Sequence, residues 1–322
     1  MRRAVAGALL AAAVLTLTFV LVEAAPGSPA DLIAGERPLS PEVRARLDAA
    51  YGLDRPPLSR YAVWLLGAAR GDLGWSISRG RPVTAVLSAA LPPTLLLSGL
   101  ALSIQLGLGL ALAVLHVVRP RGAFDHAAGV FGLSLASIPT FWLALMAILA
   151  LSYRVPLFPP SSSRSIGSEG WPLAVRALDA LWHAALPAAV LGVGAAAAFA
   201  RYVRAGLLRA LGEGFVRAAR ARGASSRALV TRHALRATLP PMVTLAGVSL
   251  PALVSGSLVV EVVFGWPGMG RLAYDAVIAR DVPVVLATVL VGTALVVVGS
   301  LAADLGLAWA DPRARGAVAE AP

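Results

Sequence analysis

The side chains best suited to chemistry lie in one polar loop, residues 201–240, between two long apolar runs. Residues 201–236 contain nine arginines and a single acid, Glu213. A guanidinium group can bind a carboxylate through two parallel hydrogen bonds, so this loop could hold an acidic partner. Arg217, Arg220 and Arg222 lie together on one short segment of it. We therefore interpret the loop as a docking surface rather than a catalytic centre.

Charge alone has a simpler explanation. Cytoplasmic loops of membrane proteins are rich in arginine because the charge sets their topology, and some arginines bind anionic lipid headgroups. We favour this explanation for Arg201, Arg204 and Arg209, near the end of the preceding apolar run. It does not account for the order Arg-Ala-Ala-x-x-x-Gly at 217–223, followed by Arg-His-Ala-Leu-Arg at 232–236 and then proline.

The sequence offers no catalytic or metal-binding constellation. It contains no cysteine, and its four histidines lack metal-ligand spacing. Gly-x-Ser-x-Gly, His-Glu-x-x-His and paired-aspartate patterns are absent, which argues against a membrane enzyme. A Walker A phosphate loop is also absent, so we expect no cofactor in this chain and ATP hydrolysis, if any, in a partner.

Composition indicates an all-α integral membrane protein. Of 322 residues, 58% are hydrophobic and 14% are charged, whereas a soluble domain has roughly 25% charged residues. Stretches of about 17–25 apolar residues can cross a bilayer as helices. We predict six transmembrane helices, at 4–22, 94–118, 127–151, 183–200, 241–264 and 282–303. The first could instead be a signal peptide, but its apolar run is longer than usual for one, and we favour a retained span.

The distribution of arginine predicts the orientation. The loop at 201–236 is strongly basic, whereas residues 23–93 have eight arginines against seven acids and residues 265–281 have two of each. Arginines at both ends of the chain and in the 119–126 turn agree with this arrangement. We therefore expect cytoplasmic N and C termini, and the strong positive charge then reflects topology rather than nucleic-acid binding.

These spans divide the chain into a first transmembrane helix at 1–23, an extracytoplasmic segment at 24–93, a five-helix core at 94–310 and a cytoplasmic tail at 311–322. In the extracytoplasmic segment, Ser40-Pro41-Glu42 predicts a helix start, with an end at Gly52. A second helix is expected over 58–70, with Gly71 as its stop. Tyr61, Trp64 and Leu65 would share its apolar face.

Two helices separated by a break are expected in the arginine-rich loop. Phe215 to Arg222 favours helix, and Gly223 can take the left-handed conformation that ends it. Ser225 or Ser226 would cap a second helix running to Leu235, before Pro240-Pro241 begins the fifth span. Ala218, Ala219 and Ala221 would keep the first helix thin enough to lie in a groove of a partner.

A series of short motifs resembles the peptide and nickel branch of binding-protein-dependent ABC importer permeases. The loop matches the family's EAA region at Ala218, Ala219 and Gly223, with Arg217 in place of the Glu. The resemblance runs almost end to end through the motifs Ala25-Pro-Gly-Ser-Pro29, Tyr51-Gly-Leu-Asp-Arg-Pro56, Gly71-Asp-Leu-Gly-Trp-Ser76, Leu91-Pro-Pro-Thr94, Ser137-Ile-Pro-Thr-Phe-Trp142, Leu186-Pro-Ala188, Glu261-Val-Val-Phe-Gly-Trp-Pro-Gly-Met-Gly-Arg271, Ala279-Arg-Asp-Val-Pro-Val-Val285 and Asp311-Pro-Arg313.

The resemblance implies an ABC importer type I permease fold in the bacterial cytoplasmic (inner) membrane. It implies a subunit without catalysis that pairs with a second, homologous permease, cytoplasmic ATPase subunits that bind ATP and Mg²⁺, and an extracytoplasmic binding protein. Di- and oligopeptides are the expected substrates, with nickel chelates or another small solute as the alternative. The implied ATPase-docking residues of the coupling helix are Phe215, Arg217, Ala218, Ala219, Arg220, Arg222, Gly223 and Ser225.

Other polar residues lie within the spans. Glu261 could bind a cationic peptide amine or pair with Arg271 or Arg280. Ser255 and Ser257 form a small polar patch that would suit either helix packing or a translocation path. For Gln105 we expect an interhelical hydrogen bond. A secondary carrier is the remaining alternative function, but inverted repeats with broken helices are not apparent.

Overall fold

The computed structural model describes residues 2–24, 40–43, 45, 54–119, 129, 132, 134 and 137–310. These residues are mainly helical, with one two-stranded antiparallel hairpin. Contacts divide the chain into two compact units: Met1–Thr94 with Pro267–Val297, and Leu95–Trp266 with Val298–Pro322. The predicted tail, residues 311–322, lies outside the described residues.

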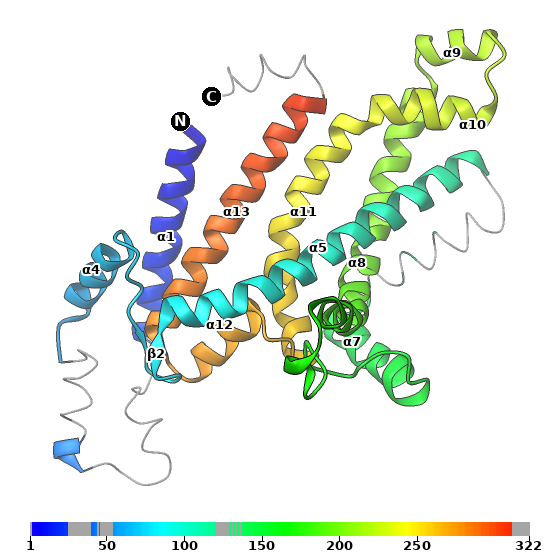
Figure 1. Cartoon of the computed structure of the whole chain (residues 1–322). Helices are drawn as coiled ribbons and strands as arrows, with labels where there is room; N and C mark the ends of the chain where they lie inside the picture. Colours follow the sequence, from blue (N-terminus) through cyan, green and yellow to red (C-terminus); the bar gives the residue numbers. More distant parts are fainter. Residues whose placement is uncertain are drawn as a thin grey trace. The chain divides into compact units, whose positions relative to one another are not determined.

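The first unit is built on two helices that pack side by side. It contains α1 (Arg2–Ala24), α4 (Pro57–Ala68), β1 (Trp75–Ser76), β2 (Arg81–Pro82), the start of α5 (Val83–Val118), α12 (Met269–Ile278) and the start of α13 (Val282–Ala310). Gly7 of α1 faces Val297, and Leu15 and Phe19 pack with Leu286. The two helices are therefore antiparallel (Figure 1).

The helix α4 covers α1 through its aromatic face. The rings of Tyr61 and Phe19 stack with centroids 4.8 Å apart, and the Tyr61 hydroxyl lies 2.8 Å from Thr16 Oγ1. Trp64 and Leu65 pack on the same cluster. The predicted apolar face is thus confirmed. The predicted start of the earlier helix is also seen, since the Val43 amide donates to Ser40 Oγ at 3.4 Å, but its end at Gly52 lies outside the described residues.

The second unit is a helix bundle with close contacts through small residues. It contains the rest of α5, α7 (Thr140–Ile148), the π-helical turn η1 (Leu149–Arg154), the 3-10 turn η2 (Ser168–Gly170), α8 (Leu173–Leu211), α9 (Gly214–Ala221), α10 (Ser226–Ala228), the π-helical turn η3 (Leu229–Ala234), α11 (Leu235–Val263) and the end of α13. At Gly192 of α8 an added Cβ would come within 2.6 Å of the Ala101 carbonyl oxygen of α5. Glycine therefore lets these helices approach closely, as is typical in membranes.

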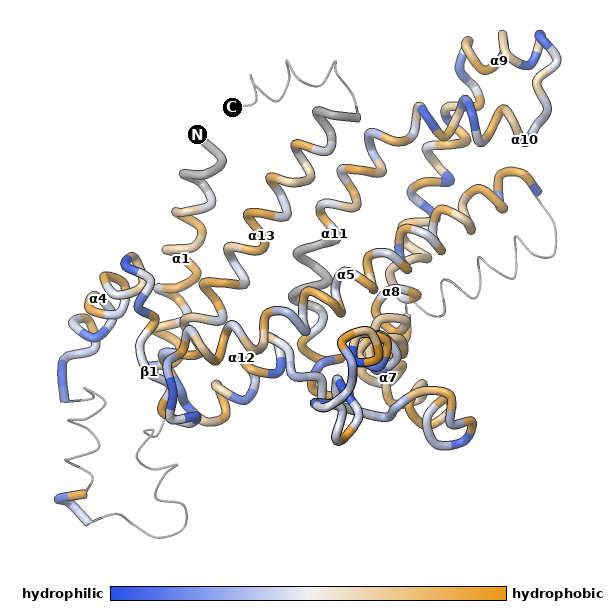
Figure 2. The backbone as a smooth tube through the Cα atoms, viewed as in Figure 1, coloured by the Kyte–Doolittle hydropathy of each residue, from blue (hydrophilic) through white to orange (hydrophobic). Residues whose placement is uncertain are grey.

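Most predicted spans appear as helices, with longer extents than expected. Four described segments are long and apolar enough to cross a membrane: Gly7–Ala24, Val83–Val118, Leu173–Leu211 and Val282–Ala303. Figure 2 shows hydrophobic residues along α5 and α13 and hydrophilic residues in the hairpin and around α9. Because α5 begins at Val83, part of the expected extracytoplasmic segment belongs to this helix.

Two local expectations were wrong. The predicted span at 127–151 is interrupted at Ile138 and Pro139, and α7 begins after Pro139, because proline disfavours helix in the preceding residue and lacks an N–H. The second loop helix does not end at Leu235. It continues into α11, which contains Pro240. Membrane helices tolerate such prolines because neighbouring groups and local backbone adjustments satisfy the freed backbone groups.

Candidate functional site

The helix α9 forms the tip of the arginine-rich loop, between the end of α8 and α10 (Figure 1). The helix α8 ends at Leu211, where the Gly212 amide bonds to the Arg209 carbonyl oxygen at 3.0 Å. Glu213 has extended backbone, and its carbonyl accepts from the amides of Val216 and Arg217 to begin α9. A sharp turn thus separates α8 from α9, and the bounds of α9, Gly214–Ala221, lie within one residue of the helix predicted from Phe215 to Arg222.

The C-terminal turn of α9 depends on Gly223. This residue has a φ of +85°, and its amide donates to the Arg220 carbonyl at 2.9 Å. The Ala224 amide donates a hydrogen bond to the Ala219 carbonyl at 3.2 Å. Together these bonds form a Schellman motif, which requires a left-handed residue that glycine adopts without strain. The left-handed helix end predicted at Gly223 is confirmed.

Ser225 restarts the helix. Its backbone is extended, and its side chain accepts a hydrogen bond of 3.3 Å from the Ala228 amide. This bond satisfies one of the free amides at a helix N-terminus. Of the two serines considered, Ser225 is therefore the cap. From Ser226 the helical path runs through α10 and η3 into α11, so the arginine-rich loop is attached directly to a long bundle helix.

The inner face of α9 is anchored by a small apolar cluster. Val216 is fully buried, Ala219 is 2% exposed, and both pack with Leu229 of η3. Leu211 and Ala224 complete the cluster. Ala219 was predicted to face a partner, but its i, i+3 spacing from Val216 turns it inward. It therefore holds α9 in place, and Val216 and Leu229 are supporting residues that the sequence reasoning missed.

The outer face of α9 is open. Phe215 is 47% exposed, and Ala218 is exposed beside it. Arg217, Arg220 and Arg222 are also exposed. An apolar ring among guanidinium groups on a short rigid helix can enter a groove whose rim carries carboxylates. The arrangement can bind a partner, and it contains no group placed for bond-making chemistry.

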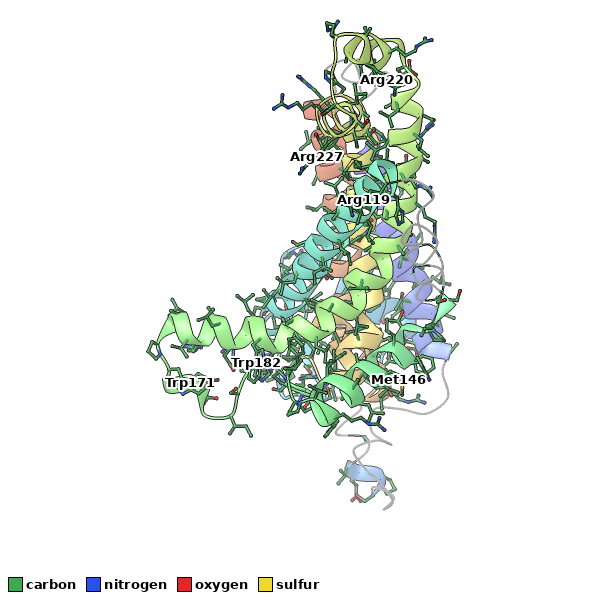
Figure 3. All side chains as sticks on the ribbon, turned by 90° about the vertical axis from the view of Figure 1, so that its right-hand side faces the viewer. Arg119, Met146, Trp171, Trp182, Arg220 and Arg227 are labelled. Atoms are coloured by element: carbon green, nitrogen blue, oxygen red, sulfur yellow. The ribbon has the colours of Figure 1, made fainter. Side chains whose placement is uncertain are left out.

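The two ends of the second unit differ in character. Figure 3 shows Arg119, Arg220 and Arg227 toward one end, and Met146, Trp171 and Trp182 toward the other. Arginine gathers on cytoplasmic loops, and tryptophan is enriched at membrane interfaces. The end that carries α9 therefore has the basic character that the expected topology assigns to a cytoplasmic loop.

Hydrogen bonds within the bundle join Gln105 to Ser249 and Ser257 to Glu261. Gln105 of α5 donates to Ser249 Oγ of α11 at 2.9 Å, which confirms the expected interhelical bond. Glu261 is completely buried, and its Oε1 accepts from Ser257 Oγ at 3.0 Å. These two residues lie one turn apart on α11. Ser255 is on the same helix, and its side chain lies outside the described residues.

Comparison with known proteins identifies the family. Residues 105–316 match the family described as "Binding-protein-dependent transport system inner membrane component". The chain belongs to this family. The permease is 36% identical over 298 residues to the oligopeptide transport system permease protein AppB of Bacillus subtilis, with 92% of each chain covered. It is 35% identical over 315 residues to the dipeptide transport system permease protein DppB of Escherichia coli, with 93% of each covered.

A solved structure extends the likeness to the fold. The permease matches a chain from inward-facing conformations of the MetNI methionine ABC transporter with a TM-score of 0.54. The match covers 71% of the permease and 97% of that chain at 23% identity. The permease therefore has an ABC importer permease fold, and the family places it in the inner membrane as a component of a transport system.

Proposed function

We propose that this permease is one membrane subunit of an ATP-driven, binding-protein-dependent importer of di- and oligopeptides. Two relatives that cover 92% and 93% of the chain carry oligopeptide and dipeptide transport in their names. The mechanism is inferred from α9. Its inner face is buried against the bundle, while the Phe215 ring and three arginines on its outer side are exposed. Such a helix suits the transfer of force from a separate ATPase to the bundle.

The coupling role follows from how α9 is connected. On one side it joins α8, and on the other Ser225 caps a helical path that becomes α11. Force applied to Phe215 or Arg220 would pass through the buried Val216 and Leu229 contact into both bundle helices. The ATPase would bind ATP and Mg²⁺, close on them, and switch the permease between inward-facing and outward-facing states.

The remaining assignments rest on the same proposal. A second, homologous permease would complete the translocation path, which would include Ser255, Ser257 and Glu261. The termini and α9 would be cytoplasmic. The hairpin and α4 would face outward, where an extracytoplasmic binding protein delivers the peptide. Arg201, Arg204 and Arg209 are suited to lipid headgroups at the cytoplasmic surface.

Co-purification tests the docking assignment. The assembled importer is solubilised from cells that carry the wild-type permease or a variant with Arg217, Arg220 and Arg222 changed to Glu. We expect the wild type to retain a Walker-motif ATPase and a second permease, and the variant to lose the ATPase alone. A control changes Arg227, Arg232 and Arg236 to Glu, which reverses the same number of exposed charges after α9.

The two possible failures are distinct. Equal loss of the ATPase from both variants would mean that loop charge, and not α9, governs assembly. Absence of an ATPase from the wild-type preparation would contradict the importer assignment. Uptake of labelled di- and oligopeptides into proteoliposomes that hold the assembled importer, with nickel chelates as the comparison, tests the substrate class.

A further inference from the structure

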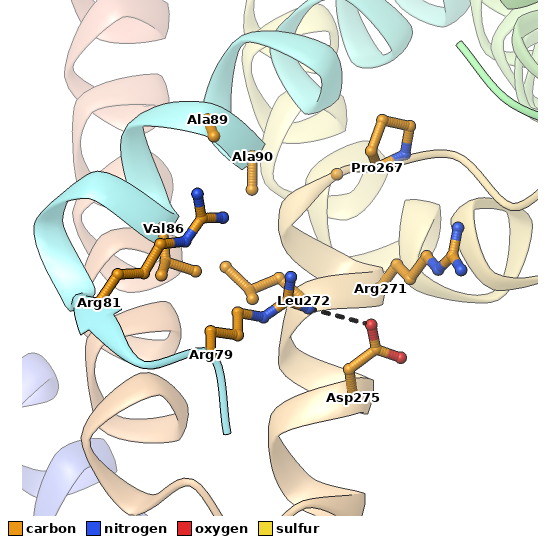
Figure 4. Close-up of a pocket in the computed structure, with 10 residues that line it drawn as sticks. Arg79, Arg81, Val86, Ala89, Ala90, Pro267, Arg271, Leu272 and Asp275 are labelled. Atoms are coloured by element: carbon orange, nitrogen blue, oxygen red, sulfur yellow. Dashed lines mark hydrogen bonds and ion pairs between the residues drawn. The ribbon is translucent and has the colours of Figure 1, made fainter. Parts of the chain in front are cut away.

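A basic pocket lies in the first unit, whereas the arginine-rich loop belongs to the second. Its cavity is about 300 Å³. The hairpin supplies Arg79 and Arg81, and α12 supplies Arg271 and Asp275 (Figure 4). Its floor is apolar, formed by the start of α5 and by Leu272 of α12, which is 3% exposed. A pocket with guanidinium groups above an apolar floor suits a carboxylate on a short hydrocarbon stem.

The charge of the pocket is positive. Three arginines line it with one carboxylate, and Arg79 Nη2 lies 3.2 Å from Asp275 Oδ2. Both members of this pair are more than one-third exposed, so water screens their attraction. Arg81 lines the same pocket and makes no ion pair within the part of the chain that the structure describes. An incoming carboxylate would therefore meet guanidinium charge.

Hydrogen bonds to Asp281 fix the hairpin that forms one wall of the pocket. The Asp281 carboxylate is fully buried, and its Oδ2 accepts from Ser76 Oγ at 2.6 Å. It also accepts from the Ser78 amide at 2.9 Å and from its hydroxyl at 2.8 Å. These bonds tie the hairpin to the junction between α12 and α13. Because both walls are fixed before binding, the pocket is preorganised for a partner.

The position of the pocket within its unit points to the partner. In α1, Gly7 lies beside Val297, while Phe19 lies near Leu286. The start of α13, and with it the pocket, is therefore at the opposite end of α1 from the N-terminus. Under the orientation in the proposed function, this end faces outward.

We propose that this pocket receives an aspartate or glutamate side chain of the extracytoplasmic binding protein. This inference rests on the proposed function, because that function supplies the partner and the orientation. A fixed guanidinium pocket above an apolar floor gives the docking protein both a charge contact and a site for its side-chain stem. Electrostatic complementarity of this kind raises the rate and specificity of association.

The experiment measures the affinity of the binding protein for the assembled importer in phosphatidylcholine nanodiscs. The binding protein used is the one that supports peptide uptake when added to proteoliposomes that hold the importer. We expect Arg81→Gln to weaken binding by roughly tenfold, and to reduce its salt dependence. The matched control is Arg70→Gln, which removes an exposed arginine of the same unit from outside the pocket.

A charge-reversal series identifies the partner residue. Arg81→Glu should weaken binding further, and one Asp→Arg or Glu→Arg change on the surface of the binding protein should restore part of the affinity. Unchanged affinity in both Arg81 variants, with normal uptake, would overturn the docking inference and leave the proposed function intact. Unchanged affinity with a raised KM for peptides that have a free C-terminal carboxylate would assign the pocket to substrate instead.

Discussion

The Asp281 carboxylate accepts a 2.6 Å hydrogen bond from the Ser76 hydroxyl, although the two residues lie 205 positions apart in the chain. Both side chains are fully buried. Ser78 adds two further donors to the same oxygen. A buried carboxylate is costly unless it is hydrogen-bonded, so these donors are required once Asp281 is placed there. The bonds fix the hairpin that carries Arg79 and Arg81.

Removal of the Asp281 carboxylate should destabilise the permease. Asp281→Ala leaves the Ser76 hydroxyl buried without this acceptor, and we expect the free energy of unfolding to fall by about 2 kcal/mol or more. SDS-induced unfolding in mixed micelles measures the change. Asp275→Ala is the control, because its ion pair with Arg79 is exposed and should contribute at most about 1 kcal/mol. Equal effects of the two substitutions would contradict the structural role of Asp281.

Gly223 should tolerate asparagine better than valine. A Cβ at this position would meet no atom within 4 Å, so any penalty comes from the φ of +85°. Left-handed backbone costs most residues about 1–2 kcal/mol, and asparagine is among the exceptions. We expect Gly223→Val to lower peptide-stimulated ATPase activity in the assembled importer, and Gly223→Asn to retain most of it. Normal activity in Gly223→Val would exclude a requirement for this turn.

Val216 and Phe215 should affect ATPase binding for different reasons. Val216→Asp places a carboxylate in a fully buried apolar position and should release α9 from the bundle. We expect weaker ATPase binding together with faster trypsin cleavage after Arg217 or Arg220. Phe215→Ala removes an exposed ring, and should weaken binding while trypsin cleavage stays at the wild-type rate. Faster cleavage in both variants would show that Phe215 supports the loop instead of contacting the partner.

The hydrogen bond between Gln105 and Ser249 should contribute little to the free energy of unfolding. Interhelical hydrogen bonds in membranes average about 0.6 kcal/mol in double-mutant cycles. The cycle combines Gln105→Leu with Ser249→Ala and uses the free energy of unfolding in SDS. We expect a coupling energy below about 2 kcal/mol. Absence of any coupling would mean that the 2.9 Å contact does not contribute to bundle stability.

Glu261 should matter for peptides with a charged amino terminus if it lies on the translocation path. Glu261→Gln retains the shape of the side chain and an oxygen that can accept from Ser257, but removes the charge. We expect uptake of free peptides to fall by about tenfold, which corresponds to about 1.4 kcal/mol. N-acetylated peptides that the importer accepts provide the comparison. An equal fall for both would assign Glu261 to bundle structure.

Local sequence signals predicted the conformation of the arginine-rich loop well, because that conformation is decided by neighbouring residues. Gly223 is the residue that a left-handed turn requires, and Ser225 is a common helix cap, so both assignments depend on steric and hydrogen-bonding preferences that act within a few positions. The apolar runs likewise predicted the long helices, because a backbone in hydrocarbon must satisfy its own hydrogen bonds. The family resemblance supplied the importer assignment.

Only the tertiary structure decided which face of each helix is buried and which distant residues it contacts. The sequence cannot show that Ala219 turns inward while Ala218 stays exposed, because both are small residues on the same short helix and their burial depends on Leu229. The bond from Ser76 to Asp281, and the basic pocket that it supports, depend on segments far apart in the chain. Such contacts arise from packing of whole elements, and no local pattern of residues specifies them.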